Sequence, residues 1–445
     1  MNKIQEEIEI LNITDEDGQT DEDESADKEV YEAAEATLLN LPVEIFLKIC
    51  SFLDADFISS TLRLVCQRFQ TILTDTELWK YWLYRRIHKR YPALPHLNIW
   101  SNNEQIWEDV CIEIDREYKK WTNVKKRMRH IIIRDIHFAS IDAVLLLDSG
   151  KICVSGGRDR GLAVWNLSTI KAHIHEETDE HCVCAYPQTV SPDSHTGWIW
   201  DLAADHRDNI VFSASWDNTV KSWDLKNGLT NIQTFQCGMA ALSIVTNENL
   251  VFTGLYSKQI MIFDVRAGDK AIKVYKSHNG PVLALESFND KVASIGEDRS
   301  MAIFDRTAGQ ILFDDIKIPS KKAYPVCMSW SPAGLYIGDS KGNIHVVDPE
   351  LYVHKSRHRL WPDPVATRPP NKVTAIHQDL GSMIVCSNRG EIKFLYNTSP
   401  PEEYMTFKTE TFDLTSMQYQ NGVMAVGTCN SAIEFWIPTE RISEI

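Results

Sequence analysis

One stretch of the sequence gathers side chains that could bind a metal ion. The segment HIHEETDEHCVC carries five of them, namely His173, His175, His181, Cys182 and Cys184. Imidazole nitrogens and thiolate sulfurs are ligands that Zn²⁺ prefers, usually at the paired spacings of a zinc finger. The spacing here fits no standard finger, so we favour an ordinary polar loop over a zinc site.

Motifs for phosphate or dinucleotide chemistry are missing from the sequence. It contains no GxxxxGK[ST] phosphate-binding loop, no G-x-G-x-x-G dinucleotide fingerprint and no pair of metal-binding histidines in a helical pattern. We therefore expect a chain that is not an enzyme and that needs no cofactor.

The acidic charge of the chain is concentrated at its N-terminal end. The formal net charge is −16, and residues 1–36 hold fourteen Asp or Glu residues against Lys3 and Lys28. Residues 37–445 are therefore close to neutral, which argues against nucleic-acid binding, because that needs a basic surface. The acidic, weakly hydrophobic composition of residues 1–36 predicts a disordered tail.

Composition also bears on the compartment. The first thirty residues lack the basic start and apolar core of a secretory signal. No run of about 20 apolar residues could span a bilayer. The ten cysteines are scattered and form no compact disulfide framework. We expect an intracellular protein, cytosolic, nuclear or both, with reduced thiols and no membrane partner.

The elements begin with a short helical region at residues 37–85. Apolar residues recur there at helical spacing in two groups: Ile45, Ile49, Phe52 and Leu53, then Leu62, Val65, Cys66 and Phe69. Pro42 suits a first helical turn, and Asp75 or Thr76 suits the N-cap of a third helix that carries Leu78 and Trp79. Three short helices bury little surface alone, so we expect this unit to need a partner.

Residues 86–126 are also mainly helical by pattern. Large side chains spaced 4, 3, 4 and 3 apart fall on one helix face: Trp107, Cys111, Ile114, Tyr118 and Trp121. We interpret this segment as a structural helix that packs the helical region against the rest of the chain. The run KKRMRH at 125–130 is either a nuclear-import patch or, as we favour, a set of cations at a helix end.

Residues 127–445 repeat an eleven-residue pattern seven times. Each window leads from small residues through a polar turn into a strand: Ser155–Trp165, Ser213–Trp223, Thr253–Phe263, Ser294–Phe304, Ile337–Val347, Val385–Leu395 and Val426–Trp436. The windows end 58, 40, 41, 43, 48 and 41 residues apart. A period of about 40–45 residues with four short strands per unit predicts a β-propeller. Seven units close into a ring without an open sheet edge.

The pattern also predicts how the ring closes. About nine residues follow the last window, too few for another strand and turn, whereas residues 128–136 form a β-branched run before the first repeat. We expect this run to supply the outer strand of the seventh blade. The two long spacings correspond to inserts at residues 168–194 and 353–370, which we expect to be exposed loops.

The helical region resembles the F-box in its segments LPVEI, LVCQRF and DTELW. The repeats resemble WD40 repeats, so the chain from about residue 37 onward is similar to the F-box/WD40-repeat substrate receptors of SCF (Skp–cullin–F-box) ubiquitin ligases. The resemblance implies that a set of residues contacts a Skp-type adaptor or supports that contact: Leu41, Pro42, Glu44, Ile45, Ile49, Leu53, Val65, Cys66 and Trp79.

The WD40 resemblance also explains recurring polar residues. In that family a His, a Ser or Thr, a turn Asp and a Trp form a buried hydrogen-bonded set. The matching residues are His137, Ser155, Asp159 and Trp165 in blade one, His195, Ser213, Asp217 and Trp223 in blade two, and His278, Ser294 and Asp298 in blade four, where Phe304 replaces the Trp. A buried carboxylate needs donors, so we interpret these sets as structural and not catalytic.

The other four blades depart from this pattern. The place of the turn Asp is taken by Ser257, Lys341, Arg389 and Asn430. We expect these blades to be held mainly by apolar packing.

The residue before the turn position lies on the top rim of a WD40 propeller. In this chain the rim positions hold Arg158, Trp216, Tyr256, Glu297, Ser340, Asn388 and Cys429. Arg, Trp and Tyr dominate binding hot spots. We therefore expect blades one to three to bind the target through Arg158, Arg160, Trp216, Tyr256 and Lys258; the alternative is an ordinary solvated rim. The cations could pair with a phosphorylated or acidic segment, although Glu297 and the lack of a dense arginine set argue against it.

These features together predict an all-β seven-bladed WD40 propeller preceded by a small all-α F-box domain. The expected parts are a disordered tail at 1–36, an F-box at 37–85, a helical linker at 86–126 and the propeller at 127–445. The expected function is target recognition in an SCF ubiquitin ligase, with cullin and a RING subunit reached through the adaptor. The alternative is a WD40 scaffold that does not drive ubiquitin transfer.

Overall fold

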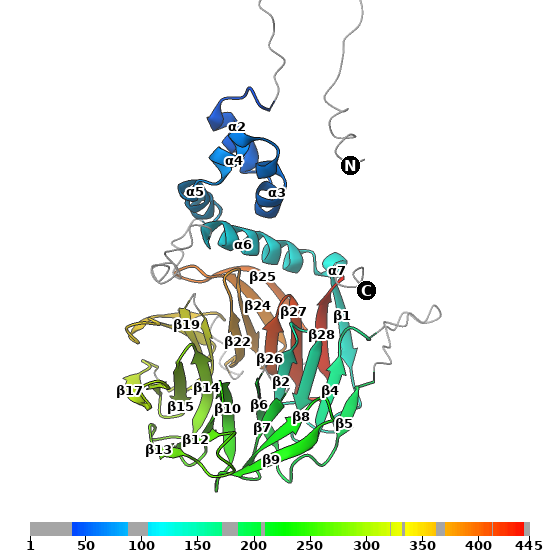
Figure 1. Cartoon of the computed structure of the whole chain (residues 1–445), viewed down its shortest axis with the longest axis vertical. Helices are drawn as coiled ribbons and strands as arrows, with labels where there is room; N and C mark the ends of the chain where they lie inside the picture. The colour runs from blue at the N-terminus through cyan, green and yellow to red at the C-terminus, as the bar shows by residue number, and fades with distance from the viewer. Residues whose placement is uncertain are drawn as a thin grey trace, which may run out of the picture. The chain divides into compact units, whose positions relative to one another are not determined.

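The computed structural model describes residues 38–87, 106–170, 186–205, 210–320, 322–331, 334–361, 370–411 and 413–439 (Figure 1). Its contacts divide the chain into two compact units, Met1–Phe52 and Leu53–Ile445. The predicted acidic tail and the histidine–cysteine segment at 173–184 lie outside the described residues.

The first unit contains helix α2 (Val43–Cys50). Pro42 is its N-cap, with φ −53° and ψ 144°, and the Pro42 carbonyl accepts the backbone N–H groups of Ile45 and Phe46. The helix ends at Ser51, whose hydroxyl donates to the Lys48 carbonyl. Proline therefore begins this helix, as the sequence predicts, because its fixed φ and missing N–H cost nothing at that position.

The second unit opens with short helices: α3 (Ala55–Ser60), the 3₁₀ turn η1 (Leu62–Leu64), α4 (Gln67–Leu73) and α5 (Thr76–Arg86). The prediction of a single helix carrying Leu62 and Phe69 is wrong. Cys66 between them is extended, with φ −155° and ψ 163°, and its sulfur accepts the Phe69 N–H as the cap of α4. The predicted Asp75 cap of α5 is confirmed, because its carboxylate accepts the Glu77 N–H at 2.9 Å.

Helix α6 (Ile106–Thr122) and helix α7 (Val124–Arg127) follow. The predicted apolar face of α6 is confirmed, with Cys111, Ile114 and Trp121 buried. Lys125, Lys126 and Arg127 of the run 125–130 lie in the last turn of α7, the helix-end position that we favoured, whereas Arg129 and His130 lie in β1. None of the helices in the described part of the chain is long and apolar enough to cross a bilayer.

Seven four-stranded antiparallel sheets form the blades of the propeller. From the inner to the outer strand, blade one consists of β2 (Ala143–Leu147), β3 (Ile152–Gly156), β4 (Leu162–Asn166) and β5 (Thr189–Ser191); blade two of β6 (Ile199–Asp205), β7 (Ile210–Ser215), β8 (Thr219–Asp224) and β9 (Thr230–Gln236); and blade three of β10 (Ala241–Asn247), β11 (Leu250–Leu255), β12 (Ile260–Asp264) and β13 (Lys273–Tyr275). Blade four consists of β14 (Val282–Phe288), β15 (Lys291–Gly296), β16 (Ser300–Asp305) and β17 (Gln310–Lys317), and blade five of β18 (Pro325–Ser331), β19 (Gly334–Asp339), β20 (Asn343–Val347) and β21 (His354–Arg359). Blade six consists of β22 (Val373–Gln378), β23 (Met383–Ser387), β24 (Glu391–Tyr396) and β25 (Glu402–Lys408), and blade seven of β26 (Leu414–Gln420), β27 (Val423–Thr428), β28 (Ile433–Pro438) and β1 (Met128–Ile133).

Each eleven-residue window of the sequence is the middle hairpin of one blade. In blade two, for example, the window runs from the second half of β7 into β8, and Ser213 pairs with Lys221 while Ala214 pairs with Val220. The inner strands contact one another in ring order, from β2 through β6 and β10 round to β26 and back to β2. The prediction of a seven-bladed propeller is confirmed.

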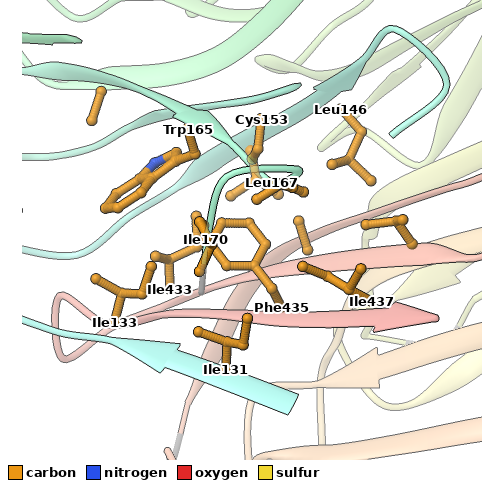
Figure 2. Packing of buried hydrophobic residues seen from close by; sticks show 14 of the residues in the cluster. Ile131, Ile133, Leu146, Cys153, Trp165, Leu167, Ile170, Ile433, Phe435 and Ile437 are labelled. Atoms are coloured by element: carbon orange, nitrogen blue, oxygen red, sulfur yellow. The ribbon is translucent and has the colours of Figure 1, made fainter. Parts of the chain in front are cut away.

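The predicted closure of the ring is confirmed as well. Strand β1 pairs antiparallel with β28, in a register that runs from Met128 opposite Pro438 to Ile133 opposite Ile433. Figure 2 shows the core that this pairing helps to build between blades seven and one, where Ile131 and Phe435 lie in the same apolar cluster as Trp165. Segments from both ends of the propeller sequence therefore share one blade.

The prediction that both inserts are entirely loop is wrong. Strand β5 lies in the first insert and β21 in the second, and each is the outer strand of its blade. An outer strand forms backbone hydrogen bonds with the adjacent inner strand, but it needs few apolar side chains. In β21, HKSRHR, exposed Lys355, Arg357 and Arg359 alternate with half-buried residues, so the polar sequence concealed a strand.

Candidate functional site

The recurring polar residues form a chain of hydrogen bonds in blade two. Asp217 lies 2.8 Å from His195 Nδ1, and His195 Nε2 lies 2.6 Å from the Ser213 hydroxyl. The Trp223 indole N–H donates to the same hydroxyl at 2.8 Å. Ser213 has one proton, which it gives to Nε2, so the neutral imidazole donates from Nδ1 to Asp217. The order of groups resembles a serine hydrolase triad, but the Ser213 side chain is fully buried and occupied by Trp223.

Blade one repeats this arrangement with His137, Asp159, Ser155 and Trp165 at 2.8–2.9 Å. In blade four, His278 bonds Ser294 and Ser300, and Phe304 makes no bond of this kind. These sets join the top turn of each hairpin to its inner and middle strands. The predicted structural reading therefore fits the geometry.

Two of the four blades without the turn Asp add buried polar bonds to their apolar packing. In blade five, fully buried Asp339 accepts from His345 Nε2 at 3.1 Å and from the Asn343 amide at 2.7 Å. In blade seven, fully buried Glu434 bonds His130 Nε2 at 2.7 Å and the Thr411 hydroxyl. In these two blades the buried carboxylate belongs to a strand residue and not to the turn residue, so the turn pattern does not reveal it.

Replacing Asp217 with asparagine is expected to lower the free energy of unfolding by about 1.5–3 kcal/mol, because bonds to a charged acceptor are lost. Burial opposes ionisation of Asp217, but bonds from His195, Thr219 and the backbone hold its pKa below the usual range. Burial also lowers the pKa of His195. Below about pH 6.5 the unfolded chain thus binds more protons than the folded chain, so stability falls as pH falls.

Urea unfolding between pH 3.5 and 7 measures both effects. The variant should lose the part of the acid dependence below about pH 4 that belongs to the Asp217 carboxylate. Asp193→Asn is the control, since Asp193 is 85% exposed. A variant as stable as the wild type, with an unchanged acid limb, would contradict the prediction.

Helix α6 is joined to the propeller by a buried polar cluster. The Tyr419 hydroxyl of β26 donates to Glu117 at 2.6 Å, and Lys120 donates to Tyr419 at 2.8 Å and also to Glu117. The Trp121 indole N–H donates to the other Glu117 oxygen at 2.8 Å. Burial and the adjacent Glu117 raise the pKa of Tyr419, so its hydroxyl stays protonated and remains a donor. The Trp121 ring stacks on Phe394 of β24 at 4.3 Å.

The other side of α6 contacts the short helices of the same unit. Glu108 accepts two bonds from Arg63 at 2.8–2.9 Å, and Asp115 accepts the Ala55 N–H at 2.9 Å. The Cys111 thiol donates to the Trp79 carbonyl at 3.6 Å. For residues 53–87, the predicted role of this helix in packing the helical region against the propeller is confirmed. In Figure 1, α6 runs alongside β25 and ends at α7, which leads into β1.

The predicted adaptor-binding residues differ in exposure. Within the first unit, Pro42, Glu44, Ile45 and Ile49 are exposed and Leu41 is partly buried. Ile45 is 48% exposed, which is unusual for an apolar side chain that has no further role.

The remaining members of the set belong to the second unit. Val65 is 61% exposed, whereas Leu53 and Cys66 are partly buried. Trp79 is buried, and its indole N–H donates to the Leu73 carbonyl at 2.8 Å, so it supports the helices and offers no surface. Adaptor binding by the exposed members stays a prediction. The sequence reading passed over Leu64, which at 72% is more exposed than Val65.

The predicted target-binding residues on blades one to three come together in a row of aromatic rings. The Trp216 ring lies 5.9 Å from Trp198, 5.9 Å from Trp200 and 5.9 Å from Tyr256, centroid to centroid. The Arg158 guanidinium lies 5.2 Å from the Trp198 ring and 5.5 Å from the Trp200 ring. The structure therefore links Arg158, Trp216 and Tyr256 through two tryptophans of β6 and the segment before it.

The other rim residues are more separate. Arg160 and Lys258 are exposed, each at a left-handed turn position with φ 71° and 73°. Arg160 reaches Asp193 at 3.9 Å. Glu297 and Cys429 are exposed, and Ser340 and Asn388 are half-buried. Binding of a target by this rim stays a prediction.

Trp198 and Trp200 are the rim residues that sequence reasoning missed. They belong to the segment HTGWIW, directly after the blade-two histidine, and the search considered only the turn between the two middle strands. Their position after His195 could have revealed them, because the segment after each blade histidine lies on the same rim as the turn. The backbone N–H of Trp216 donates to the Trp198 carbonyl at 2.9 Å, which places the two residues side by side on this rim.

The sequence also contains a G-x-S-x-G nucleophile-elbow pattern, GDSKG at 338–342. A nucleophile elbow needs a turn from a strand into a helix. Here the segment is the hairpin turn between β19 and β20, and the Ser340 hydroxyl accepts the Tyr324 N–H at 3.2 Å. The pattern is therefore part of the propeller scaffold.

Comparisons with known families agree with both parts of the chain. The family model described as F-box-like matches residues 38–85. The model described as WD domain, G-beta repeat matches residues 187–224, which end on β8 of blade two.

Similar proteins extend over most of the chain. F-box/WD repeat-containing protein 9 of Bos taurus is 29% identical over 400 residues, which cover 90% of this chain and 82% of that protein. F-box/WD repeat-containing protein mec-15 of Caenorhabditis elegans is 30% identical over 322 residues, 70% of this chain and 75% of that protein. The solved structure of U3-55K superposes with a TM-score of 0.59 at 10% identity, over 69% of this chain and 98% of that one. At that identity the likeness supports the propeller fold alone.

Proposed function

Because the chain belongs to the family of F-box/WD repeat-containing proteins, we propose that it is the substrate-receptor subunit of an SCF ubiquitin ligase. In this role residues 37–85 bind a Skp-type adaptor, which connects to cullin and a RING subunit. The propeller at 127–445 binds the target protein. The chain performs no chemistry, and its contribution is to raise the local concentration of target lysines near the charged ubiquitin carrier.

The observation that carries this proposal is the two-sided packing of α6. One side of the helix bonds α3, η1 and α5, and the other side bonds blades six and seven through Glu117, Lys120 and Trp121. A receptor has to hold its target at a defined distance from the ligase. The packing of α6 against α3, η1, α5 and the propeller would help to fix this distance for residues 53–87, whereas a flexible linker would not.

The adaptor-binding residues follow from the same proposal. In the first unit Pro42, Ile45 and Ile49 supply exposed apolar surface beside partly buried Leu41. In the second unit Val65 supplies exposed surface, and Leu53, Cys66 and Trp79 are partly or fully buried. Glu44 lies exposed in the first turn of α2 and adds a polar contact at the edge. The ligase works on intracellular proteins, so the chain acts in the cytosol, the nucleus or both.

Affinity purification tests the proposal. The wild type and a Leu41→Ala/Pro42→Ala variant are purified from cells, and co-eluting proteins are identified by mass spectrometry. Adaptor and cullin are expected with the wild type and should fall at least about tenfold in the variant, because the removed side chains anchor the contact. Other partners should persist or accumulate.

The matched control changes two exposed apolar residues at the outer strand of blade three, Ile272→Ala/Val274→Ala, which should leave adaptor recovery unchanged. The proposal fails if neither adaptor nor cullin elutes with the wild type. Partner half-lives then separate the remaining alternative. A scaffold would bind adaptor and partner without shortening the life of the partner.

A further inference from the structure

Blades one to three carry a crescent of exposed apolar side chains on their top rim. It consists of Phe138, Trp198, Trp216, Met239 and Tyr256, which are 86%, 43%, 38%, 44% and 50% exposed. Phe138 donates its backbone N–H to the turn residue Asp159, and Met239 precedes Ala240, whose carbonyl accepts the Tyr256 N–H. Five large exposed apolar side chains on one rim mark a binding surface.

The crescent is fixed before any partner arrives. The backbone N–H of Trp216 donates to the Trp198 carbonyl at 2.9 Å, and the backbone N–H of Tyr256 donates to the Ala240 carbonyl at 2.9 Å. At Gly197 an added Cβ would lie 2.5 Å from the Asp217 nitrogen, so only glycine lets the chain before β6 approach this turn. A backbone held in this way loses little conformational entropy when the surface binds a partner.

One cation of this region is already occupied. Arg158 donates to both oxygens of Asp142, at 2.8 Å and 3.3 Å, and its guanidinium faces the rings of Trp198 and Trp200. Arg158 is therefore not a free point charge for a phosphate.

Two exposed cations remain, and they stand apart. Arg160 and Lys258 lie on the turns of blades one and three, on opposite sides of Trp216. Recognition of a phosphate draws on several converging donors, typically a bidentate arginine. The rim positions of the other blades hold Glu297, Ser340, Asn388 and Cys429, which add no positive charge. The further turn cations, Arg299, Lys341 and Arg389, belong to blades four to six and lie outside the crescent.

We propose that this crescent binds an extended, unphosphorylated segment of the target, anchored by an aromatic or large aliphatic side chain that packs among Trp198, Trp216 and Tyr256. The proposal rests on the proposed function in that the segment belongs to the ligase target. The rings are tilted by 46–57° to one another, so they present edges and faces to one inserted side chain and not a single flat plane. Edge-to-face contact is the geometry that an aromatic anchor favours.

The test uses a display library of random unmodified peptides, selected on the full-length chain. Enriched peptides should share an aromatic or large aliphatic residue at one fixed position and show no enrichment of acidic residues. A labelled consensus peptide is then titrated by fluorescence anisotropy. Trp216→Ala and Trp198→Ala should each weaken its binding by at least about tenfold, as expected of hot-spot residues.

Tyr324→Ala is the matched control, because Tyr324 is 37% exposed and lies on the rim of blade five. It should change the affinity less than about twofold, as most interface-distant positions do. Circular dichroism melting of every variant shows that the propeller is intact.

Three results overturn the inference. One is a library without an enriched peptide, and another is a consensus peptide that binds Trp216→Ala as tightly as the wild type. The third is a serine-containing peptide that binds only when phosphorylated and loses affinity in Arg160→Ala/Lys258→Ala. Peptide binding by the Leu41→Ala/Pro42→Ala variant keeps this inference separate from the proposed function: it should be unchanged even if the wild type recovers no adaptor.

Discussion

Replacing Glu117 with alanine should destabilise the joint between helix α6 and the propeller by about 3–5 kcal/mol, the usual cost of removing one partner of a buried ion pair. The substitution leaves Lys120, which is 9% exposed, without its counter-charge and the buried Trp121 indole N–H without its acceptor. Urea unfolding measures the loss, and hydrogen exchange should show faster exchange along α6 than in the strands of blades two to four.

The control for this experiment lies on the same helix, one turn earlier. Glu113 is 36% exposed in its side chain and pairs with exposed Arg116, so Glu113→Ala should cost less than about 1 kcal/mol. A Lys120→Met change added to Glu117→Ala removes the stranded ammonium and should recover part of the loss. Equal stability of Glu117→Ala and Glu113→Ala would show that the cluster is not the joint.

Replacing Ile131 with aspartate should prevent closure of the ring and cost more than about 4 kcal/mol, because an unpaired carboxylate would enter an apolar core. Ile131 is 1% exposed and lies in the cluster of Phe435 and Trp165 between blades seven and one (Figure 2). Soluble yield and urea unfolding report the effect, and hydrogen exchange should reveal early opening of β28.

Two further variants keep this prediction testable if the aspartate variant does not fold. Ile131→Ala should cost about 2–5 kcal/mol through the cavity that it leaves. Arg134→Asp places the same charge on an exposed residue just after β1 and should be near neutral. A loss for Arg134→Asp as large as that for Ile131→Asp would trace the effect to charge at this chain segment and not to the core.

The propeller could be predicted from sequence because its signal is local. Each hairpin from Ser213 to Trp223 or its equivalents combines a period-two strand with a polar turn, and both lie within eleven residues. The closing strand could be predicted by elimination, since the β-branched run at 128–133 had no other blade to join. The middle hairpins of the blades could therefore be predicted, because each depends only on a short-range pattern.

The parts that could not be predicted depend on contacts between distant segments. Strand β21 carries no apolar face, and only its pairing with β20 makes it a strand. The break at Cys66 follows from an extended backbone that helical spacing does not reveal. The Asp339–His345 pair holds blade five from a position two residues before the expected turn.

The candidate site was recovered in part for the same reason. The position of Arg158, Trp216 and Tyr256 directly before the turn predicts that they share one rim. In the structure Trp216 contacts Tyr256, and Arg158 contacts Trp198 beside them. That position could not reveal that Asp142 neutralises Arg158 or that Trp198 of the next blade fills the gap, because both contacts cross between strands. The charge available for binding, which decides the class of ligand, is a property of the fold.

The shared seventh blade has a consequence for synthesis. His130 and Glu434, which bond across this blade, are 304 residues apart, so β1 leaves the ribosome long before β28 exists. At roughly 5–20 residues per second the interval is about 15–60 s. During that time the run MRHIII is an unpaired, β-branched edge, the kind of segment that pairs with other chains. Helix α6 waits as well, because its partners Tyr419 and Phe394 are made just before β28, so the ring and the joint to the helices are completed together at the end of synthesis.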